Sequence, residues 1–513
     1  MKSPGHGMGF PVFSAGMRGS VRIVTTLMGG AFIGKVLGFA REVLLAHIFG
    51  ASMVVDVFRA GVTAVQLPLL PMLSETTPTV LLPMHRAWQE KQEAPASVML
   101  AALCLVLGSG AVGLMLVVQI TGPWWVRLLV GGFGEETQSL ILQFVRIMAL
   151  WMPGAVIVEC LAAAEIALGK SRIAAMRSAV LNIFVICGIL LFVGSGALLV
   201  LPCLFAFSFN VLGVWGCWLL AREGAISTRG LNASRVKEAA IDFIRRLRPF
   251  ISLPIFQQGN LWIERLVASG FAVGTLSSLE YARTITDTLA LLISQPVGMA
   301  LLHVGVAMNT RRAVTVVAAP VLSIALPLCV FLAVFAPDIV RIVFARGAFD
   351  EVAVSLTSDA MRGICSGLWA ATLGMTLLRS LNNVGRNRAA ALLLVGSFTV
   401  SMAFNLLCSR SSGAIVRHAF LLGSAESLRG FIVLFGVAYV LRCHWQILRM
   451  LGLCAVPVVA MTALCWITAE YCASGLERVA IGATACIATI VASALVLMPA
   501  QLLALHTRPA ESP

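Results

Sequence analysis

The sequence has very little charge for its length and no long polar stretch. Only 12% of its 513 residues are charged, whereas 59% are hydrophobic, and the mean hydropathy is +0.94. A water-soluble domain carries about 25% charged residues. No polar interval is long enough for a separate soluble catalytic domain. Long apolar stretches instead recur from end to end, which predicts an all-α polytopic membrane protein.

Sequence motifs that would indicate catalysis or metal binding are also missing. The 13 cysteines include no CxxC pair and are scattered through apolar segments, so we expect neither a disulfide framework nor a metal site. The seven histidines show no metal-ligand spacing, and no glycine-rich phosphate loop ends in Lys-Ser or Lys-Thr. We therefore expect no enzymatic activity and no cofactor other than a coupling cation or the membrane potential.

The apolar stretches predict about fourteen membrane spans at roughly 20 residues each. Glycine or proline interrupts several of them, as at Pro153-Gly154 and Pro296, and such breaks are tolerated where helices line a cavity. The first stretch is too long and too charged for a signal peptide, so we expect it to be retained. The predicted extents are 23–49, 53–72, 97–121, 140–168, 174–194, 198–221, 250–270, 281–308, 314–336, 360–381, 389–408, 414–441, 450–470 and 479–505.

Lysine and arginine are divided unevenly among the predicted loops. If the N-terminus is cytoplasmic, most loop cations fall on the inner side, and both termini are predicted to lie in the cytoplasm. The asymmetry also accounts for most of the net charge of +14 without a nucleic-acid partner. The few outer-loop cations are Arg127, Arg341, Arg346, Arg410 and Arg478.

The longest inner connection, residues 222–248, separates the first six predicted spans from the next six. Its end is predicted to form an amphipathic helix on the inner leaflet, with basic residues toward lipid headgroups. The apolar side of that helix would consist of Ala239, Ala240, Phe243, Ile244 and Leu247. The predicted parts are an N-terminal lobe at 1–221, this linker at 222–248, a C-terminal lobe at 249–441, and two extra spans with a cytoplasmic tail at 442–513.

A short internal repeat supports this division. The segments GKSRIAA at 169–175 and GRNRAAA at 385–391 each precede a predicted helix. Arg41 also stands nine residues before Gly50, as Arg265 stands nine residues before Gly274. Two six-helix lobes around a central cavity, typical of alternating-access carriers, are therefore predicted.

The stretch 29–50 is long enough to cross a bilayer but carries Lys35, Arg41 and Glu42 near its middle. A charge at the centre of a lipid-facing helix costs roughly 2.5–3.5 kcal/mol on insertion scales. The three side chains must therefore face protein or a water-filled cavity. Two readings stay open, namely a self-neutralising cluster that fixes helix packing and a cavity whose cations receive an anionic substrate.

Other charges within the predicted spans extend this hypothesis. Arginine presents forked donors that suit phosphates once water is removed. Acids nearby would limit the positive charge of the empty cavity or bind a coupling cation or proton. We predict cationic cavity residues Lys35, Arg41, Arg265 and Arg283, and cavity acids Glu42, Asp56 and Glu264. Asp56 with Arg59, and Glu426 with Arg429, are spaced for pairing within their own helices.

Two motifs resemble the MurJ/MviN family, lipid II flippases of the multidrug/oligosaccharidyl-lipid/polysaccharide exporter superfamily. VLGFARE at 36–42, followed by IFGA at 48–51 and by Asp56, resembles the first-helix signature of the family. FARGAFD at 344–350 is similar to its outer-loop motif. Shorter agreements follow in order at 181–183, 268–269, 281–282 and 405–406.

The resemblance implies a flippase that carries a polyprenyl-diphosphate-linked saccharide, lipid II for peptidoglycan synthesis, from the inner to the outer leaflet. It also implies a bacterial inner-membrane location, contact with membrane lipid and cell-wall synthesis enzymes as partners. Lys35 and Arg41 would contribute to the cationic cavity, and Asp56 matches a family acid. The sequence departs from the family in two places. An arginine pair is absent after Leu67-Pro68, and Thr284 replaces an arginine, with Arg283 one position earlier.

Three other functions stay open. One is a flippase for an O-antigen or exopolysaccharide unit. Another is a drug/cation antiporter of the same superfamily, which would depend on acids rather than arginines in its cavity. The last is a non-transporting scaffold, whose cavity charges would tolerate neutral replacement.

Overall fold

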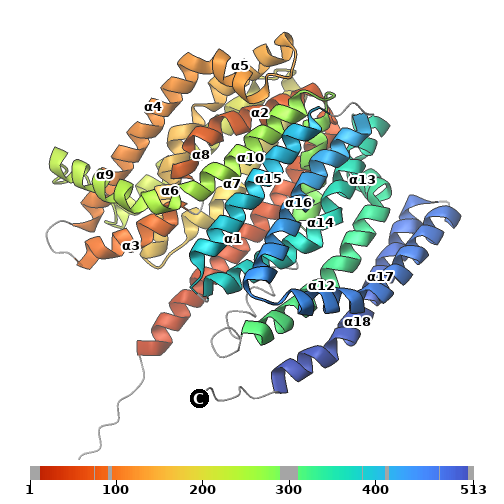
Figure 1. Ribbon diagram of the computed structural model, residues 1–513. Helices are drawn as coiled ribbons and strands as arrows, with labels where there is room; N and C mark the ends of the chain where they lie inside the picture. The colour runs from red at the N-terminus through yellow and green to blue at the C-terminus, as the bar shows by residue number, and fades with distance from the viewer. Residues whose placement is uncertain are drawn as a thin grey trace, which may run out of the picture. The chain divides into compact units, whose positions relative to one another are not determined.

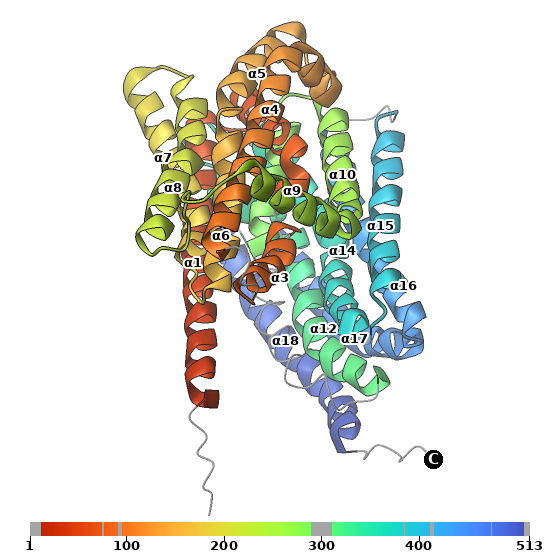
Figure 2. The same ribbon diagram turned by 90° about the vertical axis from the view of Figure 1, so that its left-hand side faces the viewer.

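The structure is a computed structural model in which the regular elements of the described residues are helices (Figure 1 and Figure 2). The predicted all-α class is thereby confirmed. The described residues are 12–73, 76–90, 95–288, 310–383, 385–410, 415–472 and 474–506.

The helices follow one another with short connections. The first half comprises α1 (Val12–Phe49), α2 (Met53–Gln66), the 3₁₀ helix η1 (Leu67–Met72), α3 (Thr76–Glu90), α4 (Ala96–Val130), α5 (Glu135–Met148), α6 (Trp151–Ala167), α7 (Arg172–Ser195), α8 (Val200–Arg222), α9 (Ala233–Leu247), η2 (Arg248–Phe250) and α10 (Ser252–Ser269). A helix at 275–288 follows. The second half comprises α12 (Thr310–Val334), α13 (Ala336–Phe344), α14 (Glu351–Asn383), α15 (Asn387–Cys408), α16 (Ile415–Val440), α17 (His444–Tyr471) and α18 (Gly475–His506).

Nine helices of the described part are long and apolar enough to cross a membrane, or ten if α5 and α6 form one bent span. The chain is therefore a multi-pass membrane protein, but the predicted count of fourteen spans is not confirmed. Helices α10 and α14 fall outside this set, and both carry charged side chains. The eighth predicted span begins in the helix 275–288, and the rest of it, with Pro296, lies outside the described residues.

The fourth predicted span is broken, but three residues earlier than Pro153-Gly154. Helix α5 ends at Met148, α6 starts at Trp151, and the two are bent by 45°. Gly154 instead serves packing, because a Cβ there would lie 2.7 Å from the backbone nitrogen of Asn210 in α8. The close approach of α6 to α8 therefore requires glycine at this position.

The chain forms two compact units that interleave along the sequence. The first unit consists of Met1–Arg41, Gly61–Trp125 and Leu142–Pro254, and the second of Glu42–Ala60, Val126–Ile141 and Ile255–Pro513. The division falls inside α1, directly after Arg41. The predicted lobe boundaries at residues 221 and 441 stay a prediction.

In the first unit, glycines on α1 bring it close to α7. A Cβ at Gly30 would lie 2.5 Å from the Cβ of Ala175, and one at Gly34 would lie 2.6 Å from the Cβ of Ser178. Glycines one helical turn apart allow two membrane helices to approach at backbone distance. This contact fixes the part of α1 that carries Lys35 and Arg41.

The first unit also contains a helix that the sequence reading missed. Helix α3 occupies a stretch assigned to a loop, and it contacts α6 and α9. Helix α9 lies at the end of the predicted linker, and Asn232 caps it by accepting a hydrogen bond from the Arg235 amide (2.9 Å). Its predicted place on the inner leaflet stays a prediction. Of its predicted apolar side, Ala239, Phe243 and Leu247 are buried, whereas Ile244 is exposed.

In the second unit, α12, α14 and α16 build the main apolar core, with α17 and α18 packed side by side against α12 (Figure 1 and Figure 2). Leu322 of α12, Leu377 of α14 and Leu434 of α16 are fully buried there. Leu497 of α18 belongs to the same cluster. The two last helices are thus part of the core of the second unit.

The two motifs that resemble the MurJ/MviN family meet in space. The amide of Ala348 donates a hydrogen bond to the carbonyl of His47 at the end of α1 (2.9 Å). Gly50 and Gly347 both adopt positive φ, at 65° and 66°, where a side chain would be strained and would clash with the facing segment. The loop 344–350 therefore holds the end of α1.

The internal repeat has matching backbone geometry. Gly169 and Gly385 follow the ends of α6 and α14 with φ of 80° and 77°, and a new helix starts shortly after each. A glycine in the left-handed conformation is a common helix terminator. The two segments are therefore the same kind of helix–turn–helix corner, one in each unit.

Candidate binding site

In the first unit, Lys35 and Arg41 lie on α1 near its contact with α7. Lys35 is exposed and Arg41 is half-buried. The Nη1 atom of Arg41 donates a hydrogen bond to Oδ1 of Asn182 on α7 (2.9 Å). The Nδ2 atom of Asn182 in turn donates to the carbonyl of Gly34 (2.9 Å). Asn182 therefore positions the Arg41 guanidinium against α7.

In the second unit, Glu42 is buried and contacts the guanidinium of Arg59 on α2. Arg59 also lies 3.7 Å from Glu280 in the helix 275–288. Its guanidinium carbon is 5.2 Å from the centre of the Tyr281 ring, within the range of a cation–π contact. Glu42, which follows Arg41 directly in the sequence, is thus paired with a cation of the second unit.

Arg283 is surrounded by three carboxylates. Its two terminal nitrogens donate to the two oxygens of Glu264 on α10, at 2.7 and 2.6 Å, in a bidentate pair. Nη1 also donates to Glu280 (2.9 Å), and Nε donates to Glu426 on α16 (2.6 Å). Arg265 of α10 donates to the same Glu280 oxygen at 2.5 Å. One guanidinium therefore links α10, α16 and its own helix.

We call these seven side chains the buried ion network. Each charge has at least one opposite partner, as buried charges must because removing an ion from water costs several kcal/mol. The network is mostly shielded, with Glu264 only 1% exposed. Its members are Glu42, Arg59, Glu264, Arg265, Glu280, Arg283 and Glu426.

Asp56 has a different role. Its carboxylate oxygens accept hydrogen bonds from the backbone amides of Gly274 and Ser277, both at 2.8 Å. These amides begin the helix 275–288, so Asp56 caps that helix from α2. The side chain is fully buried. The geometry is that of a structural cap.

The structure thus brings together Glu42, Glu264, Arg265 and Arg283 among the predicted site residues. It pairs Arg59 with Glu42 and Glu280, and Glu426 with Arg283, where spacing within one helix had suggested Asp56 and Arg429. Glu280 was missed because it lies one residue before the predicted start of the eighth span. Its spacing of three residues from Arg283 was the available signal.

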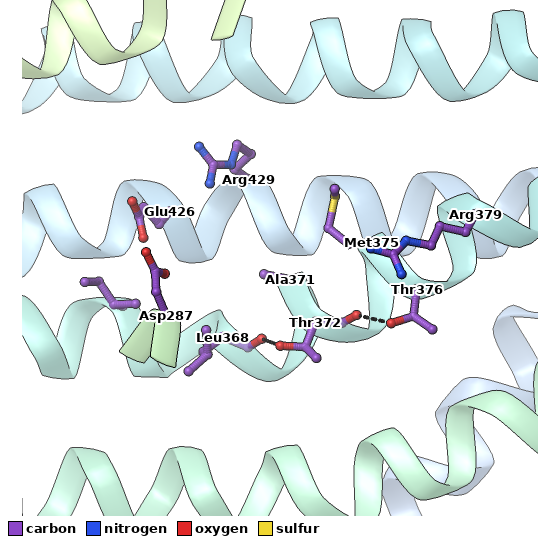
Figure 3. A pocket seen from close by; sticks show the side chains of 10 residues that line it. Asp287, Leu368, Ala371, Thr372, Met375, Thr376, Arg379, Glu426 and Arg429 are labelled. Carbon is purple, nitrogen blue, oxygen red and sulfur yellow. Dashed lines mark hydrogen bonds between the residues drawn. The ribbon is translucent and has the colours of Figure 1, made fainter. Parts of the chain in front are cut away.

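A cavity of about 270 Å³ lies within the second unit, between α14, α16 and the helix 275–288. Figure 3 shows Asp287 and Glu426 at one end of it, Arg379 at the other, and Arg429 projecting from α16. The hydroxyls of Thr372 and Thr376 donate to carbonyls of their own helix. Within the described residues, no group of three or more His, Cys, Asp or Glu side chains could hold a metal ion.

Charges held inside a bundle of apolar spans and paired across helices are typical of polytopic membrane transporters. The family model described as lipid II flippase MurJ matches residues 45–498. The chain therefore belongs to the MurJ family of lipid II flippases. No curated protein matches the sequence.

Solved structures support the fold. A structure of the lipid II flippase MurJ in an inward closed conformation matches with a TM-score of 0.77, at 15% identity, over 92% of this chain and 98% of that one. An inward-facing multidrug resistance MATE transporter matches at 0.61, with 15% identity over 81% and 94%. A MOP superfamily transporter from Pyrococcus furiosus matches at 0.54, with 16% identity over 84% and 95%. The MATE-like folds are more distant and do not outweigh the family match.

Proposed function

We propose that this chain carries lipid II from the inner to the outer leaflet by alternating access, without making or breaking a covalent bond. The family match over residues 45–498 carries this proposal. A polyprenyl tail can stay in lipid while the diphosphate-sugar headgroup passes through the protein. The protein must therefore compensate the charge of the diphosphate inside the membrane, where little water is available.

Lys35 and Arg41 are the cations that we assign to the diphosphate. Lys35 is exposed, and the hydrogen bond from Arg41 to the side-chain oxygen of Asn182 orients the guanidinium. Both lie on the part of α1 that packs rigidly on α7. A preoriented cation binds an anion with less loss of side-chain entropy than a free one.

We propose that Arg265 and Arg283 also bind the diphosphate, Arg283 only after the carboxylates around it are displaced. In this structure all three nitrogens of Arg283 donate to carboxylates, whereas Arg265 donates only through Nη2, to Glu280, and its Nε and Nη1 atoms have no partner among the described residues. A substrate phosphate would have to displace a carboxylate before Arg283 could bind it. We propose that such exchange, driven by the membrane potential or by a coupling cation at the released acids, accompanies the conformational change.

Location and partners follow from the same proposal. The positive-inside asymmetry of the loops supports cytoplasmic termini in a bacterial inner membrane. The substrate is a lipid-linked saccharide, so membrane lipid lines its path. Cell-wall enzymes that make or consume lipid II are the partners that this chemistry requires.

A different polyprenyl-linked saccharide is the second candidate, and one observation favours it. Where the family has an arginine pair after α2, this chain has the apolar helix η1, in which Leu69 and Leu70 are buried. A cavity with fewer cations would suit a headgroup with less negative charge.

Complementation of a conditional lipid II flippase depletion strain tests the proposal. The parent chain, Arg41→Ala and the control Arg388→Ala are compared at matched membrane levels. Arg388 is an exposed cation at the start of α15, outside the proposed site. We expect rescue by the parent and the control and failure of Arg41→Ala. If a well-expressed parent does not rescue growth, another lipid-linked saccharide becomes the favoured substrate. Equal rescue by all three chains would refute the role of Arg41.

A further inference from the structure

The cavity in the second unit follows one stripe of α14. Its lining runs from Ile364 to Arg379, about 22 Å along the helix at 1.5 Å per residue. Ile364 at one end is buried, whereas Met375 and Arg379 near the other end are exposed. Asp287 is exposed as well, and Figure 3 shows it with Glu426 at the end of the cavity opposite Arg379.

Among the described residues, no carboxylate lies at ion-pair distance from Arg379 or Arg429. The nearby acid Glu426 is engaged by Arg283, at 2.5 Å. Arg429 has its guanidinium carbon 5.2 Å from the centre of the Phe398 ring, but a cation–π contact offsets only part of the cost of a charge within a membrane helix.

The apolar part of the lining indicates what kind of anion would fit. Leu368, Ala371 and Met375 line the cavity between Ile364 and Arg379. The hydroxyls of Thr372 and Thr376 are turned to their own helix, so the guanidiniums provide the charge recognition. A ligand with an anionic head and an aliphatic portion satisfies both surfaces.

We propose that Arg379 and Arg429 form an anion-binding site in the second unit that holds the phosphate-bearing head of a lipid. The shared chemistry has two sources, the diphosphate of the polyprenyl-linked substrate and the phosphate of an ordinary anionic lipid. The inference rests on the proposed function only if the bound phosphate is that of the polyprenyl-linked substrate. Arg379 and Arg429 belong neither to the buried ion network nor to the pair Lys35 and Arg41.

Binding to the purified full-length chain in detergent tests the site. The probes are undecaprenyl diphosphate, phosphatidylglycerol and the uncharged undecaprenol. The variants are Arg379→Gln, Arg429→Gln and the double variant. Arg362→Gln is the matched control, because Arg362 lies on the same helix but pairs with Asp359 away from the cavity (2.9 Å).

We expect undecaprenyl diphosphate to bind the double variant at least about tenfold more weakly than the parent and the control. Undecaprenol binding should not change. Displacement of the diphosphate by phosphatidylglycerol would assign the site to a membrane-lipid phosphate, and resistance to it would assign the substrate diphosphate. Equal diphosphate binding by the parent and the double variant would overturn the site.

Two further measurements keep the result interpretable. Arg429→Lys retains the positive charge but loses the forked donors, so it should weaken diphosphate binding without abolishing it. It replaces Arg429→Gln if that variant does not fold. Complementation is scored separately. Arginine-dependent binding without rescue would contradict the proposed function alone, whereas rescue with arginine-independent binding would contradict this site alone.

Discussion

The guanidinium of Arg41 on α1 donates a hydrogen bond to the side-chain oxygen of Asn182 on α7 over 2.9 Å. Asn182→Asp should keep this acceptor but add a negative charge beside the cation, whereas Asn182→Ala should remove the hydrogen bond. We therefore expect Asn182→Asp to lower flipping in proteoliposomes more than Asn182→Ala, by about tenfold against the parent. Equal activity of Asn182→Asp and the parent would show that the Arg41 charge is not used.

Arg283 carries a second prediction, about stability. Arg283→Gln would leave the buried carboxylate of Glu264 without its bidentate partner, which costs about 3–5 kcal/mol. The apparent melting temperature of the purified variant should fall clearly. Adding Glu264→Gln should restore part of the loss, because it removes the stranded charge. If the double variant melts no higher than Arg283→Gln, the two side chains are not coupled.

Gly30 and Gly29 on α1 provide a test variant and a control for the contact with α7. A Cβ at Gly30 would lie 2.5 Å from Ala175, whereas nothing lies within 4 Å of a Cβ at Gly29. Gly30→Ala should therefore destabilise the chain by about 1–3 kcal/mol, and Gly29→Ala should be close to neutral. Melting temperature and flipping rate are measured for both. A neutral Gly30→Ala would mean that α1 and α7 can separate without consequence.

His85 on α3 predicts a dependence on pH. Burial disfavours the charged ring and lowers the pKa of His85 below its ordinary value near 6.5. Below that pH the unfolded chain binds a proton that the folded chain does not, so stability should fall as the pH decreases from 7.5 to 5. His85→Gln should flatten this slope, and substitution of the exposed His444 should not. An unchanged slope in His85→Gln would assign the pH dependence to other groups.

The sequence predicted the helices well where apolar length alone decides the structure. Runs of about 20 apolar residues can only be helices in lipid, so every predicted span overlaps a described helix, the eighth only at its start. Helix α3 was missed because Pro83 and its polar residues resemble a loop. Its stability comes from contacts with α6 and α9, which no local pattern reveals.

The charged site was predicted in part. Burial of Glu42, Glu264, Arg265 and Arg283 could be predicted, because the sequence shows that these charges lie in apolar spans and a charge that faces lipid is costly. Their partners did not follow, because pairing depends on which helices are neighbours. Glu426 pairs with Arg283, which is 143 positions away, rather than with Arg429 one turn along α16.

The cap that Asp56 provides has a consequence for biosynthesis. Its carboxylate accepts a hydrogen bond from an amide 218 residues further along the chain. During translation the ribosome completes α2 long before the helix 275–288 exists, so the Asp56 carboxylate at first lacks the amides that it caps. The insertion machinery must therefore retain α2, or keep the carboxylate hydrated, until that later helix emerges. Truncated nascent chains that end before Gly274 should crosslink through α2 to an insertase, and chains that extend past the helix should not.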